Sequence, residues 1–440
     1  MITNKKLISA VGIILSGTVF SQVINLSSLP ILTRMFSPND FGVLSVFVSI
    51  MTICLSFSSL KFEMAIPVQN SKFKAGSVLI LGVLVSFFIS LMSFFILYIF
   101  RGSWNLSFFE NYFYFIPIGI FIGGVYQLLN YYAVYEKDYK GISISRIIQS
   151  STSVAIQILL AVIWMSPVVL LIGYIINLGG GIFYLLNRFN FKFLTLLPLY
   201  NLKQTFLENK KFPKYTVVES LANTAGLQIP LLLIAFYLGL YEVGYLFIAI
   251  KIFQAPIGLI SASVSQVFFS KSNELLTEND TTELVKDVLI FLIKFGVSSL
   301  IILVGLAYSL VELVFGDDWG KVGFYIAILS PWFILQLVVS PISTIMYTKG
   351  YNKQYMLLTV YGLFFKISVF LLSYLIFGNE TMVFTLVSVN FLFYGFCFYK
   401  FLAACNFGMR NLISVVANSC LFILMSLILS LFIMNLDKII

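Results

Sequence analysis

Residues 75–100 read AGSVLILGVLVSFFISLMSFFILYIF, an apolar stretch with Lys72 and Lys74 just before it and Arg101 just after it. The hydrocarbon core of a bilayer is about 30 Å thick, and an α-helix needs about 20 apolar residues to cross it. Because no water is present there, the backbone satisfies its own hydrogen bonds by coiling. The stretch therefore predicts a membrane-spanning helix.

The same pattern recurs along almost the whole chain. With 60% hydrophobic and 10% charged residues, the composition excludes a soluble globular protein with an ordinary polar surface. We predict an all-α integral membrane protein with thirteen spans, at residues 7–33, 41–67, 75–100, 112–134, 142–164, 167–187, 215–238, 242–268, 288–315, 323–347, 354–377, 381–403 and 412–434.

Lysine and arginine residues are sorted between alternate connections of these spans. If the N-terminus is cytoplasmic, the inner connections with their adjoining helix ends hold 20 of the 27 cations, and the outer ones hold four. This positive-inside asymmetry predicts a cytoplasmic N-terminus. The C-terminus is outside if residues 412–434 cross the membrane, which the sequence leaves open because only Asp437 and Lys438 flank that end.

The residue types exclude several classes of function. A net charge of +9 suggests nucleic-acid binding, but the cations lie at the cytoplasmic membrane face, where they orient helices and meet anionic lipid. Histidine, the commonest general base and metal ligand, is absent, and no GxxxxGK[ST] phosphate-binding loop occurs. The outer connections are short, whereas an enzyme that joins sugars there needs a sizeable external loop. We therefore expect no catalytic residues, no metal and no cofactor.

The chain shows a weak internal repeat of six spans. Tyr135-x-Lys137-x-Tyr139, between the fourth and fifth spans, matches Tyr347-x-Lys349-x-Tyr351, between the tenth and eleventh. The first connection of each half also shares a proline, a phenylalanine and a later glycine: Pro30, Phe36 and Gly42, then Pro230, Phe236 and Gly244. We predict two six-helix lobes in a parallel, pseudo-two-fold repeat around a central cavity. The expected parts are an N-terminal lobe (1–187), a cytoplasmic amphipathic linker (188–214), a C-terminal lobe (215–403) and an extra C-terminal helix (404–440).

Two lysines lie near the middle of predicted spans, where an ionisable group is costly and a functional role is the first interpretation. Lys251 and Lys366 are too deep for their side chains to reach the membrane surface easily. They predict a wet, cationic cavity suited to an anionic headgroup. The alternative is that each lysine pairs with a carboxylate or carbonyl and holds helices together. Lys294 lies nearer the inner surface, where its side chain can extend to water.

Other polar side chains recur at helical spacing in the spans. Gln254 follows Lys251 on one helix face. Arg34 closes the first span on the outside, where it can hydrogen-bond the helix end or meet a phosphate. The other cavity candidates are Gln22 and Asn25 in the first span and Gln127 and Asn130 in the fourth.

Three carboxylates near span ends are candidate coupling groups: Glu63, Glu219 and Glu312. Each could take up a proton during transport. Each could instead pair with a nearby cation, such as Lys61 or Lys214.

Six stretches of the chain resemble one family of bacterial membrane proteins. In order they are LPILTRMFSPNDFG (29–42), KFEMAIPV (61–68), YKGISISRIIQS (139–150), KFPKYTVVESLANTAGLQIPLLL (211–233), ASVSQVFFSK (262–271) and GDDWGKVGFYIAILSPWFILQLVVSPIS (316–343). They resemble the polysaccharide-export flippases, the O-antigen and exopolysaccharide translocases of the multidrug/oligosaccharidyl-lipid/polysaccharide exporter superfamily. The resemblance implies a two-lobed helical transporter that moves an undecaprenyl-diphosphate-linked oligosaccharide from the inner to the outer leaflet by alternating access.

The resemblance also implies partners and leaves alternatives. Besides the lipid-linked oligosaccharide, we expect a polysaccharide polymerase and a chain-length regulator as partners, and no nucleic acid. The family core usually has twelve spans, so the thirteenth is a departure. Drug-exporting relatives often carry an acidic residue in the first span, where this chain has only Gln22 and Asn25. A cation-coupled multidrug or small-amphiphile exporter is therefore the second hypothesis, and a membrane polysaccharide polymerase or ligase is the third.

Overall fold

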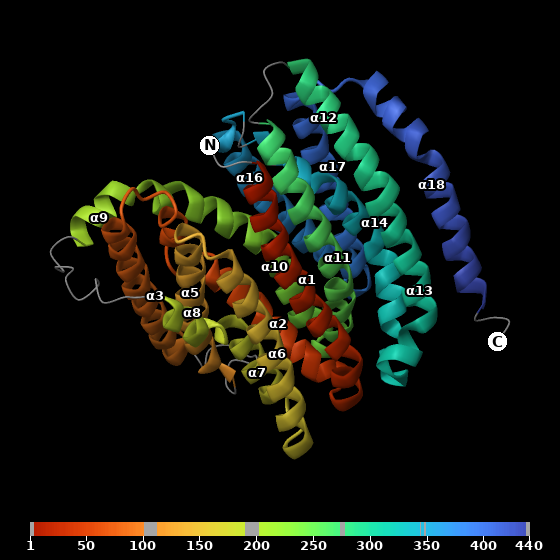
Figure 1. The fold of residues 1–440 in the computed structure, drawn as a ribbon. Coiled ribbons are helices and arrows are strands. Elements are labelled where there is room, and N and C mark those ends of the chain that lie inside the picture. Colours follow the sequence, from red (N-terminus) through yellow and green to blue (C-terminus); the bar gives the residue numbers. More distant parts are fainter. Residues whose placement is uncertain are drawn as a thin grey trace. The chain divides into compact units, whose positions relative to one another are not determined.

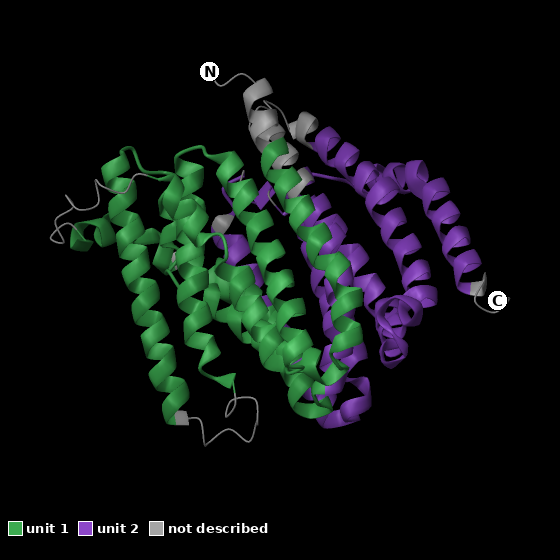
Figure 2. Ribbon diagram, turned by 60° about the horizontal axis from the view of Figure 1, so that its bottom comes forward, with its two compact units in different colours: residues 1–240 green, residues 241–440 purple. Residues whose placement is uncertain are grey.

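The computed structural model describes residues 4–100, 112–189, 202–272, 278–343, 345–346 and 349–436. In this part of the chain every regular element is a helix (Figure 1). The helices form two compact units, residues 1–240 and 241–440, which are coloured separately in Figure 2.

Thirteen helical segments among the described residues are long and apolar enough to cross a membrane. They correspond one to one to the predicted spans, so the prediction of an all-α membrane protein is confirmed and the thirteenth helix is present. Their ranges are 12–35, 38–55, 72–99, 115–135, 139–163, 167–188, 212–238, 240–261, 282–315, 317–342, 353–377, 379–404 and 409–434. The second span is shorter than the predicted 41–67, because its helix ends at Leu55 and the chain continues in turns to Leu60 and Lys61, where φ is 50° and 60°.

Unit 1 contains the first seven spans. Its elements are α1 (Asn4–Met35), α2 (Pro38–Leu55), η1 (Phe62–Ala65), α3 (Lys72–Phe100), α5 (Phe115–Tyr135), α6 (Tyr139–Ile163), α7 (Pro167–Gly179), α8 (Ile182–Arg188), α9 (Leu202–Asn209), η4 (Phe212–Thr216) and α10 (Val217–Leu238). Helix α1 packs along α6, α3 packs along α5, and α2 contacts both α7 and α10.

A capping box sets the tight turn between α1 and α2. The Ser37 hydroxyl accepts a hydrogen bond from the Asp40 N–H at 3.3 Å, and the Asp40 carboxylate accepts one from the Ser37 N–H at 2.9 Å. Pro38 occupies the first helical position, where its missing N–H costs nothing. The chain therefore re-enters a helix directly after Met35, and the connection stays short.

Small residues allow the close approach of α1 and α6. Lipid is as apolar as the side chains it surrounds, so helices in a membrane associate mainly through close packing and hydrogen bonds. A Cβ placed on Gly17 would lie only 2.7 Å from the Cα of Ser143 and would overlap its hydroxyl. Glycine at position 17 is therefore required for this helix pair to form as it does.

Unit 2 contains the remaining six spans. Its elements are α11 (Leu240–Ser272), α12 (Glu278–Phe291), η5 (Leu292–Val297), α13 (Ser298–Phe315), η6 (Asp317–Trp319), α14 (Lys321–Ile342), α16 (Asn352–Phe377), η7 (Asn379–Thr381), α17 (Met382–Ala404) and α18 (Met409–Leu436). Helices α13 and α16 end at Gly316 and Gly378, whose φ values of 103° and 74° suit glycine.

The thirteenth helix, α18, is an integral part of unit 2. It packs along α13, where the Ser309 hydroxyl donates to the carbonyl of Ile433 at 3.2 Å. A Cβ on Gly305 would lie 2.9 Å from the Cα of Ser430, so this pair too depends on a glycine for its close contact. The extra C-terminal helix is thus bound to the preceding spans through small side chains.

The two units divide the chain at a different place from the domain limits predicted above. Helix α10 falls within the predicted C-terminal lobe (215–403), yet it belongs to unit 1. It packs on α2 through a buried face that includes Ala222, Ala225 and Gly226, small residues that permit a close approach. Of the predicted linker 188–214, residues 190–201 lie outside the described residues, and the remainder includes α8's last residue and α9.

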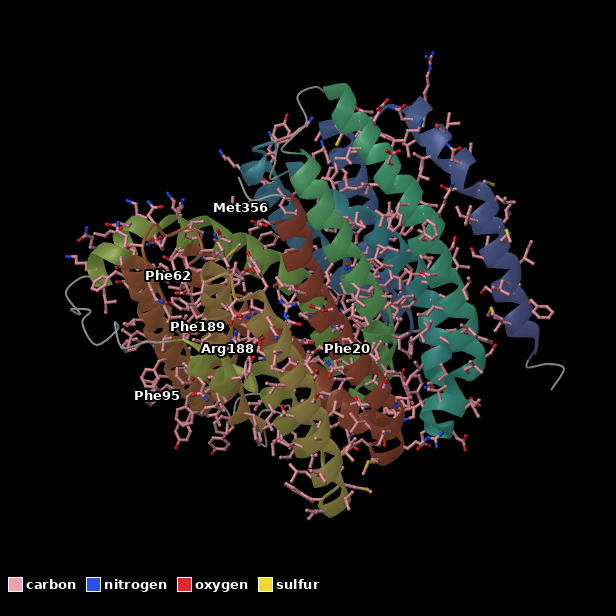
Figure 3. The ribbon with its side chains drawn as sticks, in the orientation of Figure 1. Phe20, Phe62, Phe95, Arg188, Phe189 and Met356 are labelled. Atoms are coloured by element: carbon pink, nitrogen blue, oxygen red, sulfur yellow. The ribbon has the colours of Figure 1, made fainter. Side chains whose placement is uncertain are left out.

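An ion pair joins the start of α6 to the end of α8. Asp138 caps α6 by accepting from the Gly141 N–H at 3.0 Å, and Arg188 donates to the same carboxylate, with Nη2 3.0 Å from Oδ1. Figure 3 labels Arg188 at this end of α8. Partial burial alone would raise the pKa of Asp138, but the hydrogen bonds and charge of Arg188 outweigh it and lower that pKa below its usual value.

Replacing Gly17 with leucine should destabilise the protein, because the new side chain overlaps Ser143 of α6. Overpacking of this kind typically costs about 1–3 kcal/mol. We expect a lower melting temperature for the detergent-solubilised Gly17→Leu chain. Gly12→Leu is the matched control on the same helix, because nothing lies within 4 Å of a Cβ there. An unchanged melting temperature for Gly17→Leu, or an equal loss in both variants, would contradict the packing.

Replacing Asp138 with asparagine tests the ion pair, because asparagine can still cap α6 but carries no charge. A carboxylate whose folded-state pKa is lowered stabilises the fold above its unfolded pKa, and this contribution disappears as the pH falls through the folded pKa. The wild-type chain should therefore melt higher than Asp138→Asn at pH 7, and the difference should vanish in acid, once the pH lies below the lowered pKa of Asp138. A difference that does not depend on pH would refute this account.

Candidate functional site

The most deeply buried cation of unit 2 is Lys366, near the middle of the span 353–377 on α16. Its side chain is 4% exposed. The ammonium nitrogen lies over the ring of Phe393 at 4.1 Å from the centroid and 5.6 Å from that of Tyr394. No carboxylate of the described residues forms an ion pair with it. Aromatic faces therefore take the place of a counter-ion.

The surroundings of the Lys366 side chain are formed where α16 packs against α17. Phe393, Tyr394 and Cys397 follow Asn390 at intervals of three, four and seven residues, so all four lie on one face of α17. A Cβ on Gly362 of α16, one turn before Lys366, would overlap the Phe393 ring. Glycine at 362 thus lets the ring approach α16 and cover the lysine. Asn390 adds an unsatisfied acceptor, since its Oδ1 is buried with no hydrogen-bond partner in the described structure.

Lys251 occupies the middle of the span 240–261 on α11 and is half-buried. Its ammonium nitrogen lies 5.2 Å from the centroid of Phe247, one turn earlier on the same helix. Pro256 lies inside this helix, and a proline there removes the hydrogen bond that would reach the carbonyl of Ile252. The carbonyl of the residue after Lys251 therefore lacks its usual helical donor at mid-span. Gln254, by contrast, is exposed.

A third embedded cation, Arg146, lies in unit 1. The predicted span 142–164 places Arg146 near its inner end, among the flanking cations, but α6 begins at Tyr139, so Arg146 is about two turns into the span. Its guanidinium donates to the hydroxyl of Thr18 on α1. The hydroxyl of Tyr126, which is 3.1 Å from Ser145 Oγ, also lies beside it. The spacing of polar residues along α6 was the available signal for this residue.

The polar residues predicted in unit 1 lie on α1 and α5. Gln22 and Asn25 follow Thr18 by one and two turns on α1, and both are half-buried. On α5, Asn130 is half-buried and the Oε1 of Gln127 is buried without a hydrogen-bond partner in the described part of the chain. Arg34 lies at the end of α1 and is exposed.

The three candidate coupling carboxylates lie on different elements and differ in how deeply they are buried. Glu63 is 2% exposed in η1, where it pairs with Lys61 at 3.6 Å and accepts a hydrogen bond from Ser59. It therefore lies in the turn after the second span, not within that span as predicted. Glu219 is half-buried at the start of α10, and Glu312 is exposed near the end of α13.

The described residues contain no group of three or more His, Cys, Asp and Glu side chains that could hold a metal ion. Three cations lie well inside spans, Arg146 on α6, Lys251 on α11 and Lys366 on α16, and none of them forms an ion pair in the described structure. Such an arrangement can stabilise an anion and cannot by itself bind a cation.

A family model described as "Polysaccharide biosynthesis protein" matches residues 31–323. The chain belongs to this polysaccharide biosynthesis family. The match covers the spans that carry Arg146 and Lys251, and it confirms the resemblance found in the sequence. No match is found among curated protein sequences.

Solved structures show the fold of this family member. The "Lipid II flippase MurJ, inward closed conformation" aligns with a TM-score of 0.68 and 13% identity over 97% of both chains. The MATE multidrug transporter DinF-BH aligns with a TM-score of 0.62 and 15% identity over 92% of this chain and 98% of that one. A mutant of the Vibrio cholerae MATE transporter VcmN aligns with a TM-score of 0.51 and 12% identity over 93% and 98%. The polysaccharide biosynthesis protein thus has the fold common to MurJ and the MATE transporters.

Replacing Lys366 with methionine should raise the melting temperature. The substitution removes the attraction to Phe393 and Tyr394, worth about 0.5–2 kcal/mol. It also removes a buried charge without a counter-ion, whose desolvation costs several kcal/mol. Lys400→Met is the matched control, because Lys400 also lies over two rings of α17 but is exposed. A lower melting temperature for Lys366→Met alone would show that the lysine holds α16 and α17 together, as the alternative interpretation requires.

Proposed function

We propose that this chain is a flippase that moves an undecaprenyl-diphosphate-linked oligosaccharide from the inner to the outer leaflet of the bacterial cytoplasmic membrane. Its product would supply the assembly of a surface polysaccharide such as O-antigen, capsule or exopolysaccharide. The single observation that carries the proposal is the set of embedded cations without carboxylate partners, Arg146, Lys251 and Lys366, in a polysaccharide biosynthesis protein.

The chemistry of the substrate fits these side chains. A diphosphate that leaves water loses its hydration, and an isolated charge in hydrocarbon is very costly. Fixed cations at mid-span offset that cost for an anion and increase it for a cation. The glutamine and asparagine side chains at positions 22, 25, 127, 130 and 254 offer donors and acceptors for sugar hydroxyls.

The membrane potential favours the proposed direction. We place the N-terminus in the cytoplasm, as the distribution of lysine and arginine predicts. An interior-negative potential then assists outward movement of an anion by about 2.3 kcal/mol per charge per 100 mV. Glu63, Glu219 and Glu312 remain candidate coupling groups. A polysaccharide polymerase and a chain-length regulator would act on the delivered substrate.

Neutralising the embedded cations should reduce transport. Hydrogen bonds to charged groups contribute about 1.5–3 kcal/mol, so Arg146→Gln and the double variant Lys251→Gln/Lys366→Gln should each slow translocation roughly 10- to 100-fold. The measurement is surface polysaccharide in a deletion strain, normalised to the amount of chain in the membrane. Lys140→Gln/Lys353→Gln is the matched control, because both lysines are exposed outside or at the ends of spans.

Normal surface polysaccharide in both test variants would remove these cations from the mechanism. The competing hypothesis, a cation-coupled multidrug or small-amphiphile exporter, predicts that the deletion strain changes its drug susceptibility. We expect unchanged susceptibility together with lost polysaccharide.

A further inference from the structure

Helix α9, in the segment between the sixth and seventh spans, has two opposite faces. Thr205 and Asn209, one turn apart, are 9% and 5% exposed. Lys203, Leu207 and Lys210 recur at helical spacing on the other side and are all exposed. The helix is therefore covered on one side and open on the other.

The covered face docks on unit 1. The side-chain amide of Gln69 donates to Asn209 Oδ1 at 3.1 Å, and Lys74 at the start of α3 pairs with Glu208 at 3.1 Å. The ring of Phe206 lies 5.7 Å from that of Phe62 in η1, which Figure 3 labels near α9. A hydrogen bond, an ion pair and a ring contact thus hold α9 against the ends of neighbouring elements.

This docking places α9 at the membrane surface. The α3 span begins at Lys72, beside the docked face, and the span 212–238 begins three residues after α9 ends. In three residues a chain extends at most about 10 Å. The open face of α9 is therefore at the level where two spans enter the bilayer, on the side that the positive-inside rule assigns to the cytoplasm.

The open face is positively charged. Lys203, Lys210 and Lys211 are exposed and form no ion pair among the described residues, and Lys211 lies over the ring of Phe212 at 5.4 Å. The one acidic residue of α9, Glu208, is already paired with Lys74 and Gln204. These lysines lie on both sides of Leu207, which is 53% exposed. An apolar side chain flanked by lysines is typical of a helix lying in the membrane interface.

We propose that Lys203, Leu207, Lys210 and Lys211 form a binding surface for anionic phospholipid headgroups of the cytoplasmic leaflet. The ammonium groups contact the lipid phosphates, and Leu207 enters the boundary with the acyl chains. This surface is separate from the embedded cations of the proposed transport function. Because α9 is docked on α3 and leads into α10, bound lipid holds the start of α10 at a fixed depth.

Native mass spectrometry of the full chain in detergent, titrated with phosphatidylglycerol or with phosphatidylethanolamine, tests the proposal. The variant Lys203→Gln/Lys210→Gln/Lys211→Gln should bind phosphatidylglycerol roughly 100-fold more weakly than wild type, an order-of-magnitude expectation for three lysine–phosphate contacts. Its binding of the zwitterionic lipid should not change. Lys137→Gln/Lys140→Gln/Lys353→Gln removes the same charge from exposed positions elsewhere and should leave both affinities at the wild-type value.

A second variant, Leu207→Gln, leaves the charge intact and should weaken binding of both lipids through the loss of the apolar contact. The proposal is overturned if the triple variant binds phosphatidylglycerol as wild type does, or if the control triple loses as much affinity. It is equally overturned if inorganic phosphate at millimolar concentration displaces the lipid, because the surface would then recognise free phosphate. Melting temperatures of all variants show that each is folded when it is measured.

Discussion

The absence of water from the hydrocarbon core of the bilayer is the constraint on which this structure depends. It forces each crossing segment into a helix, because backbone N–H and C=O groups have no other partner there. It also removes the hydrophobic effect as a force between helices. The helices instead associate through close packing, which glycine and serine at the contacts permit. Gly17 against Ser143, Gly305 against Ser430 and Gly362 against Phe393 are the clearest instances.

The same constraint gives the charged residues two distinct roles. Three cations at span ends are paired and join neighbouring elements: Lys72 with Glu136 at 2.9 Å, Lys74 with Glu208 and Arg188 with Asp138. Exposed pairs of this kind contribute little stability individually. Within the spans, Arg146, Lys251 and Lys366 meet a hydroxyl or aromatic rings and no carboxylate among the described residues. A charge kept in such a costly position points to a function that needs it there.

The fold shared with MurJ and the MATE transporters does not by itself identify a substrate. One helical architecture is compatible with lipid-linked and with small-molecule cargo, so the cargo has to be inferred from particular side chains. Here the first span carries Gln22 and Asn25, with no carboxylate, and Arg146, Lys251 and Lys366 lie well inside other spans. In the proposed function these residues suit an anionic cargo, which is compatible with membership of the polysaccharide biosynthesis family.

Hydropathy and charge are properties of the chain read residue by residue, and they were sufficient to predict the thirteen spans and the depth of Lys251 and Lys366. Which side chains meet each other depends on how each helix is rotated and which neighbour it packs against, and no local pattern contains that information. Only the tertiary structure therefore placed Phe393 over Lys366, brought Arg146 to Thr18 and assigned α10 to unit 1. The position of Glu63 was also decided there, because the helix of the second span ends at Leu55, before the apolar run ends, and Glu63 follows in η1.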